Sequence, residues 1–136
     1  MILLLQGRVE HVLLHFATRA LYGHLLAAGI EIYEYRRSFL HAKVAVIDGV
    51  WATVGSSNID PFSLLVAREA NVVVENESFA LILHASLDAA MRDAAVRISD
   101  DGWRLLSLPK KILSWLAYWL ARVLAGVTGY ARGEFN

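Results

Sequence analysis

Apolar and polar residues repeat with two different periods in the first part of the chain. Ile2 to Leu5 is a continuous apolar run of strand length, whereas Glu10 to Ala28 repeats its apolar residues with the period of an amphipathic helix. Gly29 follows this stretch, and glycine is a typical helix-ending residue. Ile30 to Tyr35 then alternates as a strand does. The order strand, helix, strand predicts a parallel βαβ unit.

A β-hairpin is predicted next. Leu40 to Ile47 and Val50 to Val54 are rich in β-branched apolar residues, and the Asp48-Gly49 dipeptide between them favours a tight hairpin turn. Asn71 to Glu75 reads as a further strand. We expect the hairpin and this strand to extend the sheet that the βαβ unit begins.

A capped helix completes the predicted domain. Asn76 is a good N-cap residue for a helix that covers about Glu77 to Ile98. The predicted fold class is therefore α/β, with a mixed β-sheet flanked by helices. Residues 1–98 form this domain, and residues 99–108 link it to a C-terminal helix and tail at 109–136.

The C-terminal segment is apolar and amphipathic. Between Ile112 and Val127 the only charged residue is Arg122. The run is shorter than the ~20 residues that span a bilayer, and its arginine would lie near the middle. We therefore expect a helix that lies on a membrane surface. The alternatives are a helix that docks on a missing half of a longer protein or on a partner chain, and a single membrane pass. At helical spacing, one face carries Ile112, Leu116, Trp119, Leu120, Val123 and Val127, and the other carries Ser114, Tyr118, Ala121, Arg122 and Ala125.

Composition narrows the classes of function. The 136 residues suit one domain, and the 57% hydrophobic content indicates an apolar surface somewhere on it. Basic and acidic residues number 13 each, so the chain lacks the basic field of a nonspecific nuclease, and nucleic acid is not expected as a partner. The absence of cysteine excludes disulfides and thiolate metal sites.

The chemistry-bearing residues lie in and after the hairpin. Their spacing is H-x-K-x4-D-x6-G-S-x-N, from His41 to Asn58. In a regular strand His41 and Lys43 point to one side, where an imidazole can attack phosphorus and an ammonium can hold the phosphate oxygens. Ser56 and Asn58 would add uncharged donors at the same edge. Asp48 has the opposite strand parity and is interpreted as structural.

This pattern resembles the signature of the phospholipase D superfamily, whose members transfer phosphodiester groups through a covalent phosphohistidine. The resemblance implies a phospholipase D-like half-domain in which His41, Lys43, Asp48 and Asn58 belong to the catalytic motif. It also implies that Glu69 orients the imidazole. His41 would act either as the nucleophile or as the general acid, and no cofactor or metal would be needed.

Within the superfamily, the chain is most similar to bacterial cardiolipin synthases, over about Ile2 to Ile98. The resemblance implies a phosphatidyltransferase that acts on a phosphatidylglycerol-like phospholipid at the bacterial cell membrane, either peripherally or through a C-terminal anchor. Ser56, Ser57 and Arg8 are the candidate substrate-binding residues. The similar stretches read LLLQGRVEH, LLAAGIEIYEY, FLHAKVAVID and GSSNIDPFSL.

The motif occurs once, although the family builds one active site from two motifs. We therefore expect the N-terminally incomplete C-terminal half of a longer enzyme, paired with a second half-domain in the same polypeptide or in a homodimer. A homodimeric single-motif phosphodiesterase or nuclease is one alternative function. An inactive lipid-binding fragment is the other.

Overall fold

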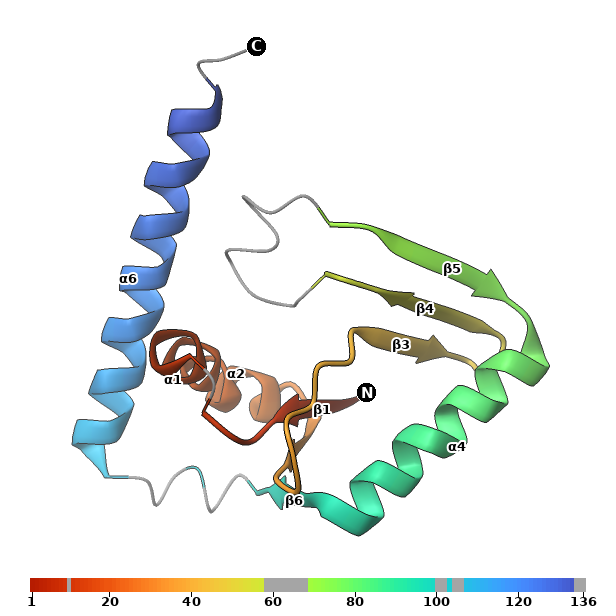
Figure 1. Cartoon of the computed structure of the whole chain (residues 1–136). Helices are drawn as coiled ribbons and strands as arrows, with labels where there is room; N and C mark the ends of the chain where they lie inside the picture. Colours follow the sequence, from red (N-terminus) through yellow and green to blue (C-terminus); the bar gives the residue numbers. More distant parts are fainter. Residues whose placement is uncertain (10, 58–68, 100–102, 104–106, 134–136) are drawn as a thin grey trace.

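The computed structural model describes residues 1–9, 11–57, 69–99, 103 and 107–133. It contains two small β-sheets with helices packed beside them, and a long C-terminal helix (Figure 1). The expected α/β class and the C-terminal helix are confirmed. The elements are β1 (Ile2–Gln6), α1 (Val12–Ala20), α2 (Tyr22–Ala27), β2 (Glu31–Tyr35), β3 (Val44–Ile47), β4 (Trp51–Gly55), β5 (Asn71–Glu75), α4 (Glu77–Ala94), β6 (Ala95–Ile98) and α6 (Leu108–Gly133).

Sheet A has the strand order β1-β2-β6. β1 and β2 are parallel, with Ile2 opposite Glu31, which confirms the βαβ unit. The helix that connects them ends as expected at Gly29, whose φ is 77°. The N–H groups of Gly29 and Ile30 donate to the carbonyls of Leu26 and Leu25, a Schellman arrangement that satisfies the last helical carbonyls.

The prediction of a single helix from Glu10 to Ala28 is wrong, because the helix is broken at Leu21. The Leu21 N–H donates to the Thr18 carbonyl at 3.1 Å, a tighter turn than an α-helix makes, and α2 starts at Tyr22. The break sets Tyr22 into the core, where it is 3% exposed.

The helix expected to reach Ile98 is also too long, since α4 ends at Ala94 and the next four residues form β6. β6 pairs antiparallel with β2, with Ile98 opposite Ile32. The edge of β2 opposite β1 provides the backbone pairing that overrides the helical pattern here. The predicted cap at Asn76 is confirmed, because its Oδ1 accepts from the Phe79 N–H at 2.9 Å.

Sheet B is a separate antiparallel meander, β3-β4-β5, and not an extension of sheet A as expected. β2 already lies between β1 and β6, so neither of its edges is open to β3. The hairpin is confirmed, but three residues, 48–50, separate the paired strands, and β3 starts at Val44 and not at Leu40. Asp48 and Gly49 have φ values of 53° and 69°, as a type I′ turn requires.

Sheet A buries a carboxylate. Glu34 is 0% exposed and shares its side of β2 with Ile32. The guanidinium groups of Arg19 and Arg36 donate to its two oxygens at 2.6 and 2.9 Å, and the Tyr22 hydroxyl lies 3.3 Å away. Burial raises the pKa of Tyr22, and the charge of Glu34 raises it further. Glu34 therefore ties α1 and the segment after β2 to sheet A.

α6 packs on α1 through small residues. Ala117 and Ala121 contact Ala17, with Leu13 and Phe16 at the margin, and this cluster joins the two helices. The side of α6 with large apolar residues faces away from α1 and is exposed. The small-residue face of α6 thus packs on α1 of the same chain, an arrangement that the sequence did not predict. Within the part of the chain that is described, no helix combines the length and hydropathy needed to cross a membrane.

Glu34→Gln is expected to destabilise the fold by about 3 kcal/mol, because two guanidinium groups would lose a buried counter-charge. Glu31→Gln on the same strand is the matched control. Glu31 pairs with Arg97 at 3.2 Å, but its side chain is 41% exposed, so its loss should cost under about 1 kcal/mol. Urea unfolding followed by circular dichroism measures both. Equal effects of the two changes would contradict this account of Glu34.

His15 should make stability depend on pH. Burial lowers the pKa of His15 below 6.5, Arg19 lowers it further, and Glu34 partly opposes both. Between that lowered pKa and 6.5 the unfolded chain binds the proton more readily, so stability falls as the pH falls through this window. The loss of stability between about pH 7.5 and about pH 5.5 should be smaller in His15→Gln than in the wild type. His11→Gln, at an exposed position before α1, should keep the wild-type loss.

Candidate functional site

The predicted site residues gather at one edge of sheet B. His41 and Lys43 precede β3, Ser56 follows β4, and Glu69 precedes β5. Because neighbouring strands of a meander run in opposite directions, these positions meet at the same end of the sheet. Two hydrogen bonds hold the ends together: Gly55 N–H to the Lys43 carbonyl at 2.9 Å, and Ser56 N–H to the Ala70 carbonyl at 3.0 Å.

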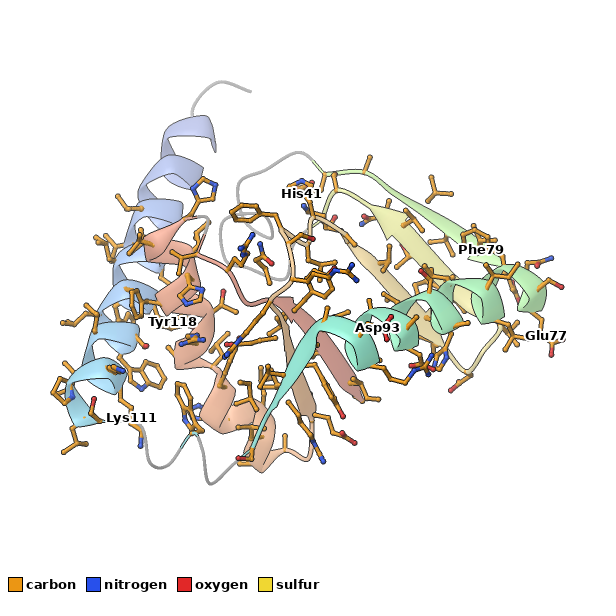
Figure 2. All side chains as sticks on the ribbon, turned by 60° about the horizontal axis from the view of Figure 1, so that its bottom comes forward. His41, Glu77, Phe79, Asp93, Lys111 and Tyr118 are labelled. Carbon is orange, nitrogen blue, oxygen red and sulfur yellow. The ribbon has the colours of Figure 1, made fainter. Side chains whose placement is uncertain are left out.

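His41 and Lys43 share one side of the chain, as the sequence predicts. Lys43 Nζ lies 2.8 Å from His41 Nε2, His41 is exposed and Lys43 is half-buried (Figure 2). A lysine ammonium can only donate, so a hydrogen bond at this distance requires Nε2 to accept, which is the role it has in the tautomer with the ring proton on Nδ1. This tautomer presents the Nε2 lone pair and the ammonium at one exposed place, which suits attack on a phosphate whose oxygens the ammonium holds.

The segment that leads into His41 is fixed by the loop after β1. Gln6 Oε1 accepts from the Leu40 N–H at 3.1 Å, and Gly7 N–H donates to the Tyr35 carbonyl at 2.8 Å. A Cβ at Gly7 would lie 2.7 Å from that carbonyl oxygen, so the close approach requires glycine. Sequence reasoning missed the role of Gln6, and the one available signal was its place at the carboxyl end of a parallel strand.

The serines after β4 clamp the start of β5. Ser56 Oγ accepts from the Ala70 N–H at 3.0 Å, and Ser57 Oγ accepts from Asn71 Nδ2 at 2.7 Å. A Cβ at Gly55 would collide with the Asn71 side-chain oxygen and lie 2.5 Å from the Ala70 carbonyl oxygen. Both hydroxyls thus hold strand ends in register. Their predicted contact with substrate remains a prediction.

The other predicted site residues are placed as follows. Glu69 is half-buried at the same edge, and among the described residues no hydrogen bond joins it to His41. Asp48 lies in the turn at the opposite end of β3, where its positive φ fits a structural role. The guanidinium of Arg8 is exposed and stacks 5.8 Å from the Phe39 ring centroid. Asn58 lies outside the described residues.

Two further features lie apart from the motif. Across the described ranges, no three histidine, aspartate or glutamate side chains come together as a metal-binding group. A cavity of about 330 Å³ opens between α2 and the first turns of α6, and no motif residue lines it. Its lining consists of Ala20, Gly23, His24, Ala27, Trp103, Lys111 and Trp115.

Comparison with known proteins gives consistent matches. Residues 2–91 match the family described as "Cardiolipin synthase, PLD-like domain". The chain is 43% identical to cardiolipin synthase B of Escherichia coli strain K12 over 109 residues, which are 80% of the chain and 25% of that protein. It is 32% identical to the minor cardiolipin synthase of Bacillus subtilis strain 168 over 92 residues, 68% of the chain and 23% of that protein.

The chain therefore spans about a quarter of the length of these relatives. A match to cardiolipin synthase A of Erwinia tasmaniensis is shorter, at 37% identity over 71 residues, 52% of the chain and 15% of that protein. No solved structure matches the chain significantly. The family match ends before α6.

Gly55→Ala is expected to lower stability by about 1–3 kcal/mol, because the new methyl group would push the Asn71 side chain and the Ala70 backbone away from β4. Gly126→Ala is the matched control. A Cβ there meets nothing within 4 Å, and alanine should stabilise α6 slightly. Thermal unfolding measures both variants. An unchanged Gly55→Ala melting temperature would show that the strand ends are not held as described.

Proposed function

Because the chain belongs to the cardiolipin synthase family of phospholipase D-like domains, we propose that it supplies half of the active site of a phosphatidyltransferase. The observation that carries the proposal is the contact between His41 Nε2 and Lys43 Nζ at an exposed sheet edge. An imidazole lone pair beside an ammonium is a combination that can attack and stabilise a phosphodiester. The proposed substrate is a phosphatidylglycerol-like phospholipid.

The proposed reaction has two steps, each with one imidazole on either side of the phosphorus. In the first, Nε2 of one imidazole forms a bond to phosphorus, the bond to the leaving alcohol oxygen breaks, and the second imidazole protonates that oxygen. In the second, the same second imidazole removes a proton from the hydroxyl of another phospholipid. That oxygen then attacks phosphorus and breaks the phosphorus–nitrogen bond. His41 fits either role.

Lys43 would bind the nonbridging oxygens in both steps. In the structure its ammonium lies against Nε2, so an arriving phosphate would compete for the same donors and release the Nε2 lone pair. Glu69, at the same edge, is proposed to accept a hydrogen bond from the Nδ1–H group, which would keep the proton on Nδ1 and the Nε2 lone pair reactive. Asn58 is proposed as a further donor to phosphate, and Arg8 as a headgroup contact.

The proposed partner is a second half-domain with its own histidine and lysine. The relatives are about four times as long as the matched segment, which favours a second motif elsewhere in a longer polypeptide over a dimer of single-motif chains. Since the substrate would be a membrane phospholipid, the enzyme is proposed to work at the membrane surface of a bacterial cell.

The test is a chimera in which this chain replaces the matching segment of the Escherichia coli K12 relative. The chimera should convert phosphatidylglycerol to cardiolipin, and His41→Ala should lower the rate on the order of 1000-fold, because the imidazole would be required in both steps. Lys43→Met should lower it on the order of 100-fold, because the ammonium stabilises charge without bonding to phosphorus. Mass spectrometry of the extracted lipids measures the product.

His11→Asn, at an exposed position outside the motif, is the control and should leave the rate within about threefold of the chimera. A folded chimera whose rate does not respond to His41→Ala would refute the proposal. In a separate assay, the isolated chain is offered a chromogenic phosphodiester. Hydrolysis by a dimer of the isolated chain would support the homodimeric single-motif enzyme instead.

A further inference from the structure

α6 carries positive charge without any negative charge. It contains Lys110, Lys111, Arg122 and Arg132, and it contains no acidic residue. These are four of the 13 basic residues of the chain, which leaves nine basic against 13 acidic residues outside α6. The chain is neutral as a whole and yet strongly polarised. An anionic surface would attract α6 and repel the remainder.

The outward side of α6 is a continuous apolar stripe. Seven large side chains recur at helical spacing from Leu108 to Val123, a length of about 23 Å at 1.5 Å per residue. They stay exposed because α6 contacts α1 through the opposite, small-residue side. We call these seven residues the outer face: Leu108 (73% exposed), Ile112 (59%), Trp115 (39%), Leu116 (62%), Trp119 (59%), Leu120 (50%) and Val123 (57%).

Cations and aromatic rings border the outer face. Lys111 and Arg122 are about three helical turns apart, so helical geometry puts them on the same flank, between the outer face and the side that packs on α1. The Arg122 guanidinium lies 5.9 Å from the ring centroids of both Tyr118 and Trp119, and it donates to the Tyr118 hydroxyl at 3.3 Å. Lys111 and Trp115 both line the cavity beside α2.

This arrangement matches the interfacial region of a lipid layer. Apolar side chains can enter the acyl region, indole and phenol rings favour headgroup depth, and flanking cations meet lipid phosphates. A protein partner would also cover an apolar stripe. A helix with four cations and no acidic residue, carried by a net acidic body, is suited to an anionic lipid surface and would repel a second copy of itself placed face to face.

We propose that the outer face of α6 lies in the surface of an anionic phospholipid membrane, with the helix parallel to it and α1 on the opposite side. The proposal deepens the proposed function and rests on it for the expectation that the substrate is a membrane lipid. Binding itself requires no turnover. The two can therefore fail separately. A wild-type chain that does not bind vesicles would refute this inference, whereas a chimera whose rate does not respond to His41→Ala would refute the proposed function.

The experiment measures co-sedimentation of the purified full chain with vesicles of phosphatidylcholine alone or mixed with phosphatidylglycerol. The wild type should bind the mixed vesicles on the order of 10-fold more tightly. The double change Leu116→Glu with Trp119→Glu should weaken binding at least about 100-fold, because two apolar anchors become charged. Lys111→Gln with Arg122→Gln should remove most of this preference for phosphatidylglycerol.

The matched control is Val72→Glu with Ile82→Glu, two residues that are 65% and 71% exposed on β5 and α4. It should bind as the wild type does, and urea unfolding checks that every variant is folded. Vesicle binding that survives the α6 changes would overturn the proposal. A second outcome would also overturn it: a wild type that binds no vesicles but forms a dimer in light scattering, which the α6 changes convert to a monomer. The outer face would then be a contact between two copies of the chain.

Discussion

The hydrogen bond from the Gly55 N–H to the Lys43 carbonyl fixes where the chemistry can occur. It extends the β3-β4 ladder one residue beyond the last strand pair and so holds Lys43 at the end of β4. One residue later, the Ser56 N–H donates to the Ala70 carbonyl and Ser56 Oγ accepts from the Ala70 N–H, so the end of β4 is also held to the start of β5. Only glycine fits at this crossing, because a side chain would collide with Asn71. Three separate segments thus end at one edge, where His41 is exposed and Lys43 is half-buried.

The sequence could predict this part of the site because its determinants are local. His41 and Lys43 are two residues apart, and in extended backbone that spacing alone puts them on one side, even though β3 begins only at Val44. The Asp48-Gly49 turn and the Asn76 cap are also set by residues within one turn of each other. The family match agrees with the resemblance that the motif carries.

The features that the sequence did not predict depend on partners far away in the chain. β6 forms because β2 offers a free edge more than 60 residues earlier, and no local pattern reveals that edge. Glu34 is buried because Arg19 reaches it from α1. The hydrophobic pattern distinguishes the two sides of α6, but the pattern alone does not say which side packs on the rest of the protein. The small side fits closely on Ala17, so the large apolar side remains outside.

The central claim is that Lys43 presents its ammonium to Nε2 of a neutral His41, and nitrogen-15 NMR of the histidine ring tests it most directly. At mildly alkaline pH the ring of His41 should be the Nδ1–H tautomer, and its Nε2 signal should move when Lys43 is changed to methionine or when inorganic phosphate is added. A ring in the Nε2–H tautomer, with a signal that ignores both changes, would contradict the account.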